Sequence, residues 1–163
     1  DALEALSSIA DAFLGNDRRI VARYDDSVVR VVEKQEIQLV RRARGYAPTP
    51  LFVDAVPGCT ATVFAAGPEQ KSTFCHVRGE HAFLSQHLGD LERLGAWSAW
   101  EEARLRYEEL FELRADALAC DLHPDYLASK WARKQAREQG LPLVEVHDEA
   151  KKVIKEALAK CGL

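Results

Sequence analysis

The stretch GPEQKST, residues 67–73, combines a turn, a cation and two hydroxyl groups directly after an apolar run. Lys71 can offset the charge of a phosphate, and Ser72 and Thr73 can donate hydrogen bonds to its oxygens. These three residues are therefore candidate nucleotide- or phosphate-binding residues. An ordinary hairpin whose lysine and serine face solvent would have the same composition, so both interpretations stay open on composition alone.

The order of residues in this stretch excludes a P-loop, G-x-x-x-x-G-K-[ST], which leads from a strand directly into a helix. The spacing from Gly67 to Lys71 is too short, and no second glycine precedes the lysine. The following residues, STFCHV, are rich in β-branched and aromatic types, which predicts a second strand. Actin-like and Hsp70-like folds hold nucleotide phosphates at the turn of such a hairpin, through backbone N–H groups, hydroxyls and a nearby cation. The sequence is compatible with that kind of hairpin.

Further polar side chains could contribute to the same chemistry. Arg42 and Arg44 in RRARG each carry a forked guanidinium that suits phosphate oxygens, although a solvated arginine cluster on an edge strand has the same pattern. Ser85, His87 and Asp90 in SQHLGDL follow the hairpin, and Asp90 could cap the helix after it.

The stretch CDLHPDY offers a second candidate position. Asp121 ends an apolar strand and His123 lies in the loop after it, where open α/β sheets place ligand-binding groups. Pro124 and Asp125 are also typical of a helix start, so the loop has a structural explanation as well.

The elements that must position these residues follow from hydrophobic spacing and turn residues. A β-meander followed by alternating helices and strands, and preceded by a helix and a β-hairpin, predicts an α/β (mixed α+β) fold. The two prolines and the glycine of RGYAPTP predict a boundary within residues 45–58. The expected segments are a helix over 3–14, a hairpin around 33–36, strands at 61–66, 71–77 and 80–84, a helix over 95–114, a strand at 117–122, a helix over 126–139, a strand at 141–146 and a last helix from about 148.

Composition restricts the class of protein. The 163 residues allow one domain or two small lobes, and the net charge of −4 gives no reason to expect nucleic acid as a partner. No apolar run approaches the roughly 20 residues that span a bilayer, so no membrane association is expected. Four scattered cysteines without a C-x-x-C pair predict reduced thiols and a cytoplasmic location. The lack of methionine and the start within an amphipathic pattern suggest a piece of a longer protein.

Several segments together resemble one family, the HypF carbamoyltransferases of [NiFe]-hydrogenase maturation. They occur in the family's order and cover nearly the whole chain: IADAFLGNDRRIVARYDDSVVR, RRARGYAPTPL, AAGPEQKSTFC, AFLSQHLGDLE, ACDLHPDYLASKWA and LPLVEV. The resemblance implies that residues 1–48 are the C-terminal part of a YrdC-like carbamoyl-adenylate module. It implies that residues 58–163 are the first lobe of a TsaD-like carbamoyl-transfer module with an actin-like, ribonuclease-H-like fold. Antibiotic O-carbamoyltransferases join related modules in the opposite order and fit less well.

The resemblance also implies a chemistry. The family uses carbamoyl phosphate and ATP, for which Mg is the expected companion ion, and forms carbamoyl-adenylate. It then transfers the carbamoyl group to the C-terminal cysteine thiol of the partner HypE, and the product becomes a cyanide ligand of the hydrogenase iron. Ser27, in DDSVV, matches a serine that contacts nucleotide phosphates in YrdC-like proteins. Ser85, His87 and Asp90 resemble a family motif that follows the hairpin, which implies that they line the cleft, with a helix cap as the equal alternative for Asp90. The isolated 163-residue chain is expected to be inactive, because the second lobe of the actin-like module is not part of it.

The family's metal motif, H-x-x-x-H after a VEV-like strand, is only half present. This chain reads VEVHDEAKK, so His147 matches the first ligand, whereas Lys151 occupies the second position. A lysine ammonium is a poor ligand, which puts Fe or Zn binding in question. A non-catalytic scaffold or partner-docking fragment of the same fold, with its metal site lost, is therefore the alternative to a carbamoyltransferase segment.

Overall fold

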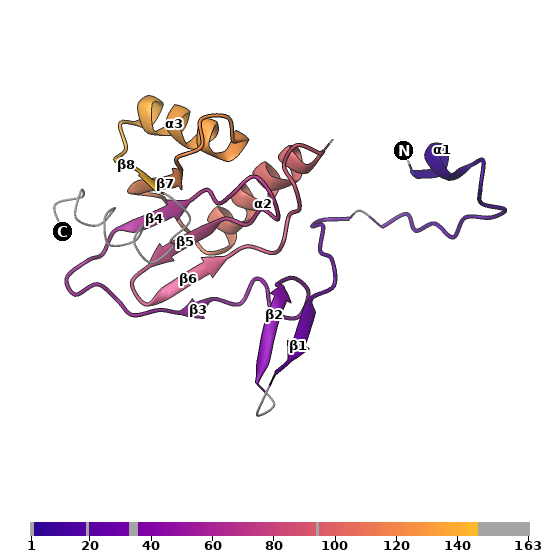
Figure 1. Cartoon of the computed structure of the whole chain (residues 1–163), viewed down its shortest axis with the longest axis horizontal. Helices are drawn as coiled ribbons and strands as arrows, with labels where there is room; N and C mark the ends of the chain where they lie inside the picture. The colour runs from indigo at the N-terminus through magenta and orange to yellow at the C-terminus, as the bar shows by residue number, and fades with distance from the viewer. Residues whose placement is uncertain (1, 19, 33–35, 94, 147–163) are drawn as a thin grey trace.

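The structure, a computed structural model, describes residues 2–18, 20–32, 36–93 and 95–146 (Figure 1). Within these residues a two-stranded hairpin precedes a six-stranded sheet that carries two helices. None of the helices described is long and apolar enough to cross a bilayer. The elements are α1 (Ala2–Leu6), β1 (Val28–Val31), β2 (Ile37–Arg41), β3 (Leu51–Phe52), β4 (Thr62–Ala65), β5 (Cys75–Arg78), β6 (His81–Leu84), α2 (Ala96–Leu110), β7 (Ala117–Asp121), α3 (Leu127–Gln139) and β8 (Leu143–Val146).

The large sheet has the order β3-β6-β5-β4-β7-β8. Strands β4, β5 and β6 form the expected antiparallel meander, and β7 then pairs parallel to β4 on its other side. Strand β8 pairs parallel to β7, with Asp121 opposite Val146. The three parallel strands β4, β7 and β8 therefore have their carboxyl ends along the same edge of the sheet, which we call the carboxyl edge. At β4 the order of the strands reverses, because β5 lies on one side of it and β7 on the other. Open α/β sheets bind ligands at such an edge.

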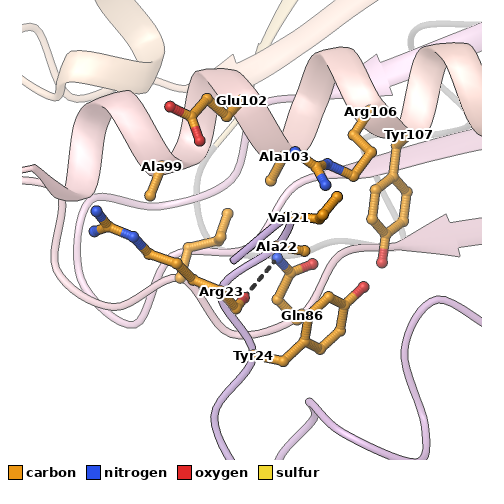
Figure 2. Close-up of a pocket in the computed structure, with 11 residues that line it drawn as sticks. Val21, Ala22, Arg23, Tyr24, Gln86, Ala99, Glu102, Ala103, Arg106 and Tyr107 are labelled. Atoms are coloured by element: carbon orange, nitrogen blue, oxygen red, sulfur yellow. Dashed lines mark hydrogen bonds between the residues drawn. The ribbon is translucent and has the colours of Figure 1, made fainter. Parts of the chain in front are cut away.

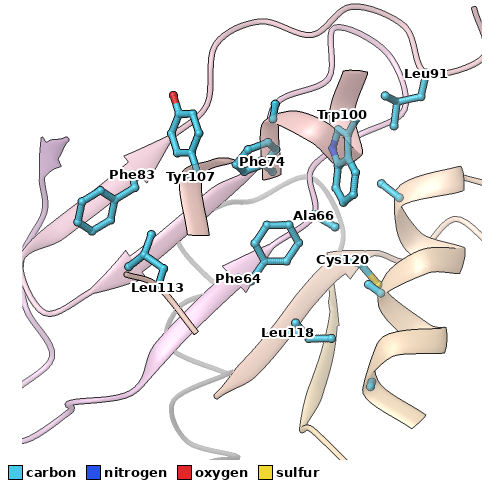
Figure 3. Packing of buried hydrophobic residues seen from close by; sticks show 14 residues of the cluster. Phe64, Ala66, Phe74, Phe83, Leu91, Trp100, Tyr107, Leu113, Leu118 and Cys120 are labelled. Carbon is cyan, nitrogen blue, oxygen red and sulfur yellow. The ribbon is translucent and has the colours of Figure 1, made fainter. Parts of the chain in front are cut away.

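Helices α2 and α3 pack on one face of this sheet over an aromatic core (Figure 3). The ring of Phe64 on β4 lies 5.8 Å from that of Phe74 and 6.0 Å from that of Trp100. On α2, Trp100 and Tyr107 are buried, whereas Leu110 is 59% exposed. The next residue, Phe111, packs against the core instead.

The first helix is shorter than its apolar spacing predicted. It ends at Leu6, where the Ser7 hydroxyl donates to the carbonyl of Glu4 at 2.9 Å and so competes with helical hydrogen bonding. Beyond it the described chain runs to the first hairpin without a further helix (Figure 1). Ile9 and Leu14 are 77% and 104% exposed, so the apolar stripe lacks the packing that stabilises a short helix.

Two other expectations need correction. The strand after the GPEQ turn begins at Cys75, not at residue 71, because Ser72 pairs with Gly89 and not with β4. The boundary segment contains β3, which pairs with β6 and extends the sheet. The hairpin around residues 33–36 is confirmed as β1 and β2, whereas the last helix, expected from about 148, lies outside the described residues.

Candidate functional site

The turn between β4 and β5 is closed tightly on itself. Gly67 has a φ of +75°, and a Cβ atom added there would lie 1.7 Å from the carbonyl oxygen of Thr73. Only glycine allows this approach, because other residues carry a Cβ and disfavour positive φ. Lys71 also has a positive φ, of 49°, and its side chain is exposed. The backbone of the turn is therefore constrained at Gly67, and the side chain of Lys71 at its exit is exposed.

The segment SQHLGDL is hydrogen-bonded to this turn. The backbone N–H of Lys71 donates to the Asp90 carboxylate at 2.9 Å, and the N–H of Ser72 donates to the carbonyl of Gly89 at 2.8 Å. In return the N–H of Leu88 donates to the carbonyl of Ser72 at 2.9 Å. The structure thus brings together two groups of candidate residues that are separated in the sequence.

Ser72 and Thr73 differ in what they offer. The side chain of Ser72 is fully buried, and its hydroxyl has no hydrogen-bond partner in the part of the chain that the structure describes. A buried hydroxyl without a partner costs about 1–3 kcal/mol, so such groups commonly face a ligand or an ordered water. Thr73 is half-buried, and its carbonyl is the one that closes on Gly67.

His87 lies between the turn and the RRARG segment. Its backbone N–H donates to the carbonyl of Arg42 at 2.8 Å. Burial lowers the pKa of the imidazole below its usual 6.5, and the positive charge of Arg41 lowers it further, whereas Asp25 and Asp90 act in the opposite direction. The ring is therefore neutral at neutral pH, and its Nδ1 atom is buried without a partner among the described residues.

The guanidinium of Arg42 is used inside the protein. It is only 9% exposed and donates to the carbonyls of Leu84 at 2.6 Å, Tyr46 at 2.8 Å and Thr49 at 2.5 Å. These bonds join the end of β6 to the turn after β2. In this conformation Arg42 serves the fold, and its proposed contact with phosphate stays a prediction.

Ser27 and Arg44 meet at the start of the small hairpin. The Ser27 hydroxyl accepts from the N–H of Ala43 and donates to the carbonyl of Arg44, both at 2.8 Å, so its donor is occupied. The Arg44 side chain is 71% exposed and lies 3.5 Å from the Asp26 carboxylate. Of these two candidates, Arg44 therefore has the accessible polar group.

Ser85 is fully buried at the end of the meander. Its hydroxyl accepts from the N–H of Phe74 at 3.0 Å and donates to the carbonyl of Gln86 at 2.9 Å. This side chain joins β6 to the chain before β5 and presents no group to an open surface.

The loop after β7 is organised around Asp121 and His123. The Asp121 carboxylate accepts from the N–H of His123 at 2.7 Å, and His123 Nδ1 accepts from the N–H of Asp125 at 3.2 Å. The imidazole is exposed and stacks on the Tyr126 ring at 4.1 Å with an angle of 14°. Because Nδ1 accepts, the neutral ring carries its proton on Nε2, which leaves that atom as a donor.

Glu69 connects this loop to the β4–β5 turn, and sequence reasoning missed it. The residue is 3% exposed, and its carboxylate accepts from the N–H of Leu127, the first residue of α3, at 2.7 Å. A carboxylate at a helix N-terminus is stabilised by the unpaired N–H groups there. No local pattern signals it, because the helix that it caps lies far along the chain.

A small cavity lies where residues 21–24 pass beside α2 (Figure 2). Its volume is about 30 Å³, and Gln86 Nε2 donates to the carbonyl of Arg23 beside it at 3.3 Å. Such a space holds about one water molecule, which is far too little for a nucleotide. The cavity is a small gap in the packing between residues 21–24 and helix α2.

The metal prediction remains without structural support. Within residues 2–146, apart from the undescribed positions 19, 33–35 and 94, no group of three or more His, Cys, Asp or Glu is arranged to hold a metal ion. His147, the candidate ligand, and Lys151 lie outside the described residues.

The mixed sheet with its leading meander, the two helices on one face and the hairpin turn at the carboxyl edge define a lobe of the actin-like, ribonuclease-H-like class. The HypF Kae1-like domain family matches residues 58–150, which is more than half of the chain. The chain belongs to this family.

Similar proteins agree with this assignment. The chain is 41% identical over 148 residues to carbamoyltransferase HypF2 of Cupriavidus necator and 40% identical over 146 residues to carbamoyltransferase HypF of Rhodobacter capsulatus. These alignments cover 90% of this chain but only 18% and 19% of the two relatives, so the chain spans less than a fifth of their length. A crystal structure of full-length HypF in its phosphate- and nucleotide-bound form superposes with a TM-score of 0.75 at 40% identity, covering 89% of this chain and 22% of that one.

Proposed function

We propose that this chain is a segment of a carbamoyltransferase that uses carbamoyl phosphate and ATP. Carbamoyl-adenylate is the intermediate, and the acceptor is the C-terminal cysteine thiol of a HypE-like protein. In the transfer step a C–S bond forms at the carbamoyl carbon, the bond to AMP breaks, and the thiol proton is released. The chain's part is to hold the nucleotide phosphates at the β4–β5 turn.

The observation that carries this proposal is the juxtaposition of Lys71, Ser72 and Asp90. An exposed ammonium, a buried hydroxyl without a partner among the described residues and a carboxylate meet at one turn. That turn lies at the carboxyl edge of parallel strands, the usual ligand edge of such a sheet. Lys71 would offset phosphate charge, and Mg²⁺ would accompany ATP.

The loop after β7 supplies the second set of polar groups. Asp121 and His123 lie at the same edge as the turn, and Glu69 connects the two segments. In the proposal this loop lines the cleft beside the phosphates, with His123 Nε2 as a donor.

A non-catalytic scaffold or partner-docking role is the second candidate. It is favoured by Lys151, which stands where the family's second metal-binding histidine is expected. In a scaffold, Lys71 would be an ordinary surface lysine.

The test uses a longer protein that contains this segment, with carbamoyl phosphate, ATP and the acceptor protein. Lys71→Ala is compared with Lys134→Ala, a change of an exposed lysine on α3. Mass spectrometry of the acceptor's C-terminal peptide measures carbamoylation of the cysteine. The proposal expects transfer in the wild type and in Lys134→Ala, and a loss of at least about tenfold in Lys71→Ala. Absence of transfer in the wild type would favour the scaffold.

A further inference from the structure

The backbone carbonyls of four successive residues, the last of β7 and three of the loop after it, converge on one arginine. Arg133 lies in the middle of α3, and its guanidinium points back to the loop that connects β7 to this helix. The acceptors are the carbonyl oxygens of Asp121 at 3.4 Å, Leu122 at 3.2 Å, His123 at 3.4 Å and Pro124 at 3.3 Å.

The orientation of this guanidinium is fixed from its other side. Arg133 Nε donates to the Glu145 carboxylate on β8 at 2.6 Å, and the two side chains are 25% and 38% exposed. A planar fork with five donors on three nitrogens can serve one carboxylate and four carbonyls at once, whereas a lysine ammonium has only three donors, all on one atom. The arrangement therefore constrains the path of the loop backbone as well as joining a helix to a strand.

The loop is tied at its other end to the β4–β5 turn. The Glu69 carboxylate accepts from the N–H of Leu127, directly after the loop. Glu69 lies two residues before Lys71, and the turn is closed by the contact between Gly67 and Thr73. The loop is thus held by Arg133 from α3 and by Glu69 from the turn.

We propose that Arg133 is a positioning residue that fixes the His123 imidazole and the Asp121 carboxylate at the ligand edge of the sheet. It acts through the carbonyls of residues 121–124 and does not itself contact the ligand. The identity of that ligand as a nucleotide rests on the proposed function, whereas the positioning of the loop does not.

The alternative is that Arg133 and Glu145 form an ordinary stabilising ion pair. Arg133→Lys separates the two, because it keeps a charge for Glu145 but loses the fork that serves the carbonyls. Lys134→Ala, next along the same helix and largely exposed, is the matched control.

The loop offers two local reporters in the 163-residue chain. The N–H of His123 donates to Asp121, and the N–H of Asp125 donates to His123 Nδ1, so both bonds exist only when the loop keeps its shape. Amide hydrogen exchange by NMR measures them. Arg133→Lys is expected to speed exchange at both by about tenfold, with β7 and the core of α3 unchanged. Unchanged exchange at both reporters, or equal acceleration across β7 and α3, would overturn the proposal.

A second variant and a binding measurement complete the design. Glu145→Gln keeps an acceptor for Arg133 but removes its charge. We therefore expect faster amide exchange at the same two reporters, by a smaller factor than in Arg133→Lys, and unchanged exchange there would count against positioning.

Titration with MgATP then tests the ligand: weaker binding in Arg133→Lys than in Lys134→Ala is the expected result. Loop loosening without ATP binding by the wild type would support positioning and contradict the proposed function. Equal ATP binding by both variants, despite a loosened loop, would overturn the claim that the loop lies at the ligand site.

Discussion

Substitution of Gly67 by alanine tests whether the hairpin turn depends on the contact with Thr73. The new Cβ would lie 1.7 Å from a backbone oxygen, whereas real Cβ contacts are essentially never under 3.0 Å. The peptide of Thr73 must therefore move away. Hydrogen bonds of the two adjacent residues oppose this movement, because Ser72 is paired with Gly89 and the N–H of Phe74 donates to the buried Ser85 hydroxyl.

The cost has three parts. Alanine at a φ of +75° costs about 1–2 kcal/mol from backbone strain alone. Displacement of a packed segment adds about 1–3 kcal/mol, and each hydrogen bond broken adds about 1 kcal/mol. With one hydrogen bond broken, Gly67→Ala should thus lower the free energy of unfolding by about 3–6 kcal/mol.

Gly58→Ala is the control that isolates the contact. Gly58 has a φ of +79°, and an added Cβ there meets nothing within 4 Å, so only the backbone term of about 1–2 kcal/mol applies. Urea unfolding followed by tryptophan fluorescence compares the two variants. An equal loss of stability in both would refute the reasoning, because the close approach would then carry no energy.

Two further predictions concern the polar groups beside the turn. Ser72→Ala removes a buried hydroxyl that has no partner among the described residues. Thermal unfolding should therefore show a stability that is unchanged or higher by up to about 1 kcal/mol, while calorimetry shows weaker MgATP binding. A clear loss of stability would contradict this prediction. His87→Gln tests the pH dependence of stability. Burial, and to a lesser extent the charge of Arg41, lowers the pKa of His87 in the folded state below 6.5. The neutral imidazole therefore contributes to stability above pH 6.5, and this contribution is lost as pH falls through the lowered pKa. Between about pH 7 and pH 5 the wild type should lose more unfolding free energy than His87→Gln, and parallel curves would argue against a depressed pKa.

The sheet and its two covering helices could be predicted because their signals are local. β-branched and aromatic runs separated by glycine turns predicted the meander of β4, β5 and β6. The helix expected over 3–14 was wrong beyond Leu6, since an apolar stripe forms a stable helix only where something packs on it.

The candidate site could be predicted only in part. Lys71, Ser72 and Asp90 carry polar groups next to a recognisable turn, and the structure brings them together. Glu69 and Arg133 could not be found, because they bind backbone groups of other segments, and no residue type or spacing signals such a partner. For the same reason the hydrogen bonds of Arg42 to backbone carbonyls were not foreseeable.

Binding of MgATP to the 163-residue chain tests the central claim, that Lys71 and its turn hold nucleotide phosphates. A ligand at about 100 times its dissociation constant stabilises the folded state by about 2.7 kcal/mol, which raises Tm by several degrees. We predict such a rise for the wild type and for Lys134→Ala, and none for Lys71→Ala at the same concentration. No rise in the wild type, or an equal rise in Lys71→Ala, would contradict the account.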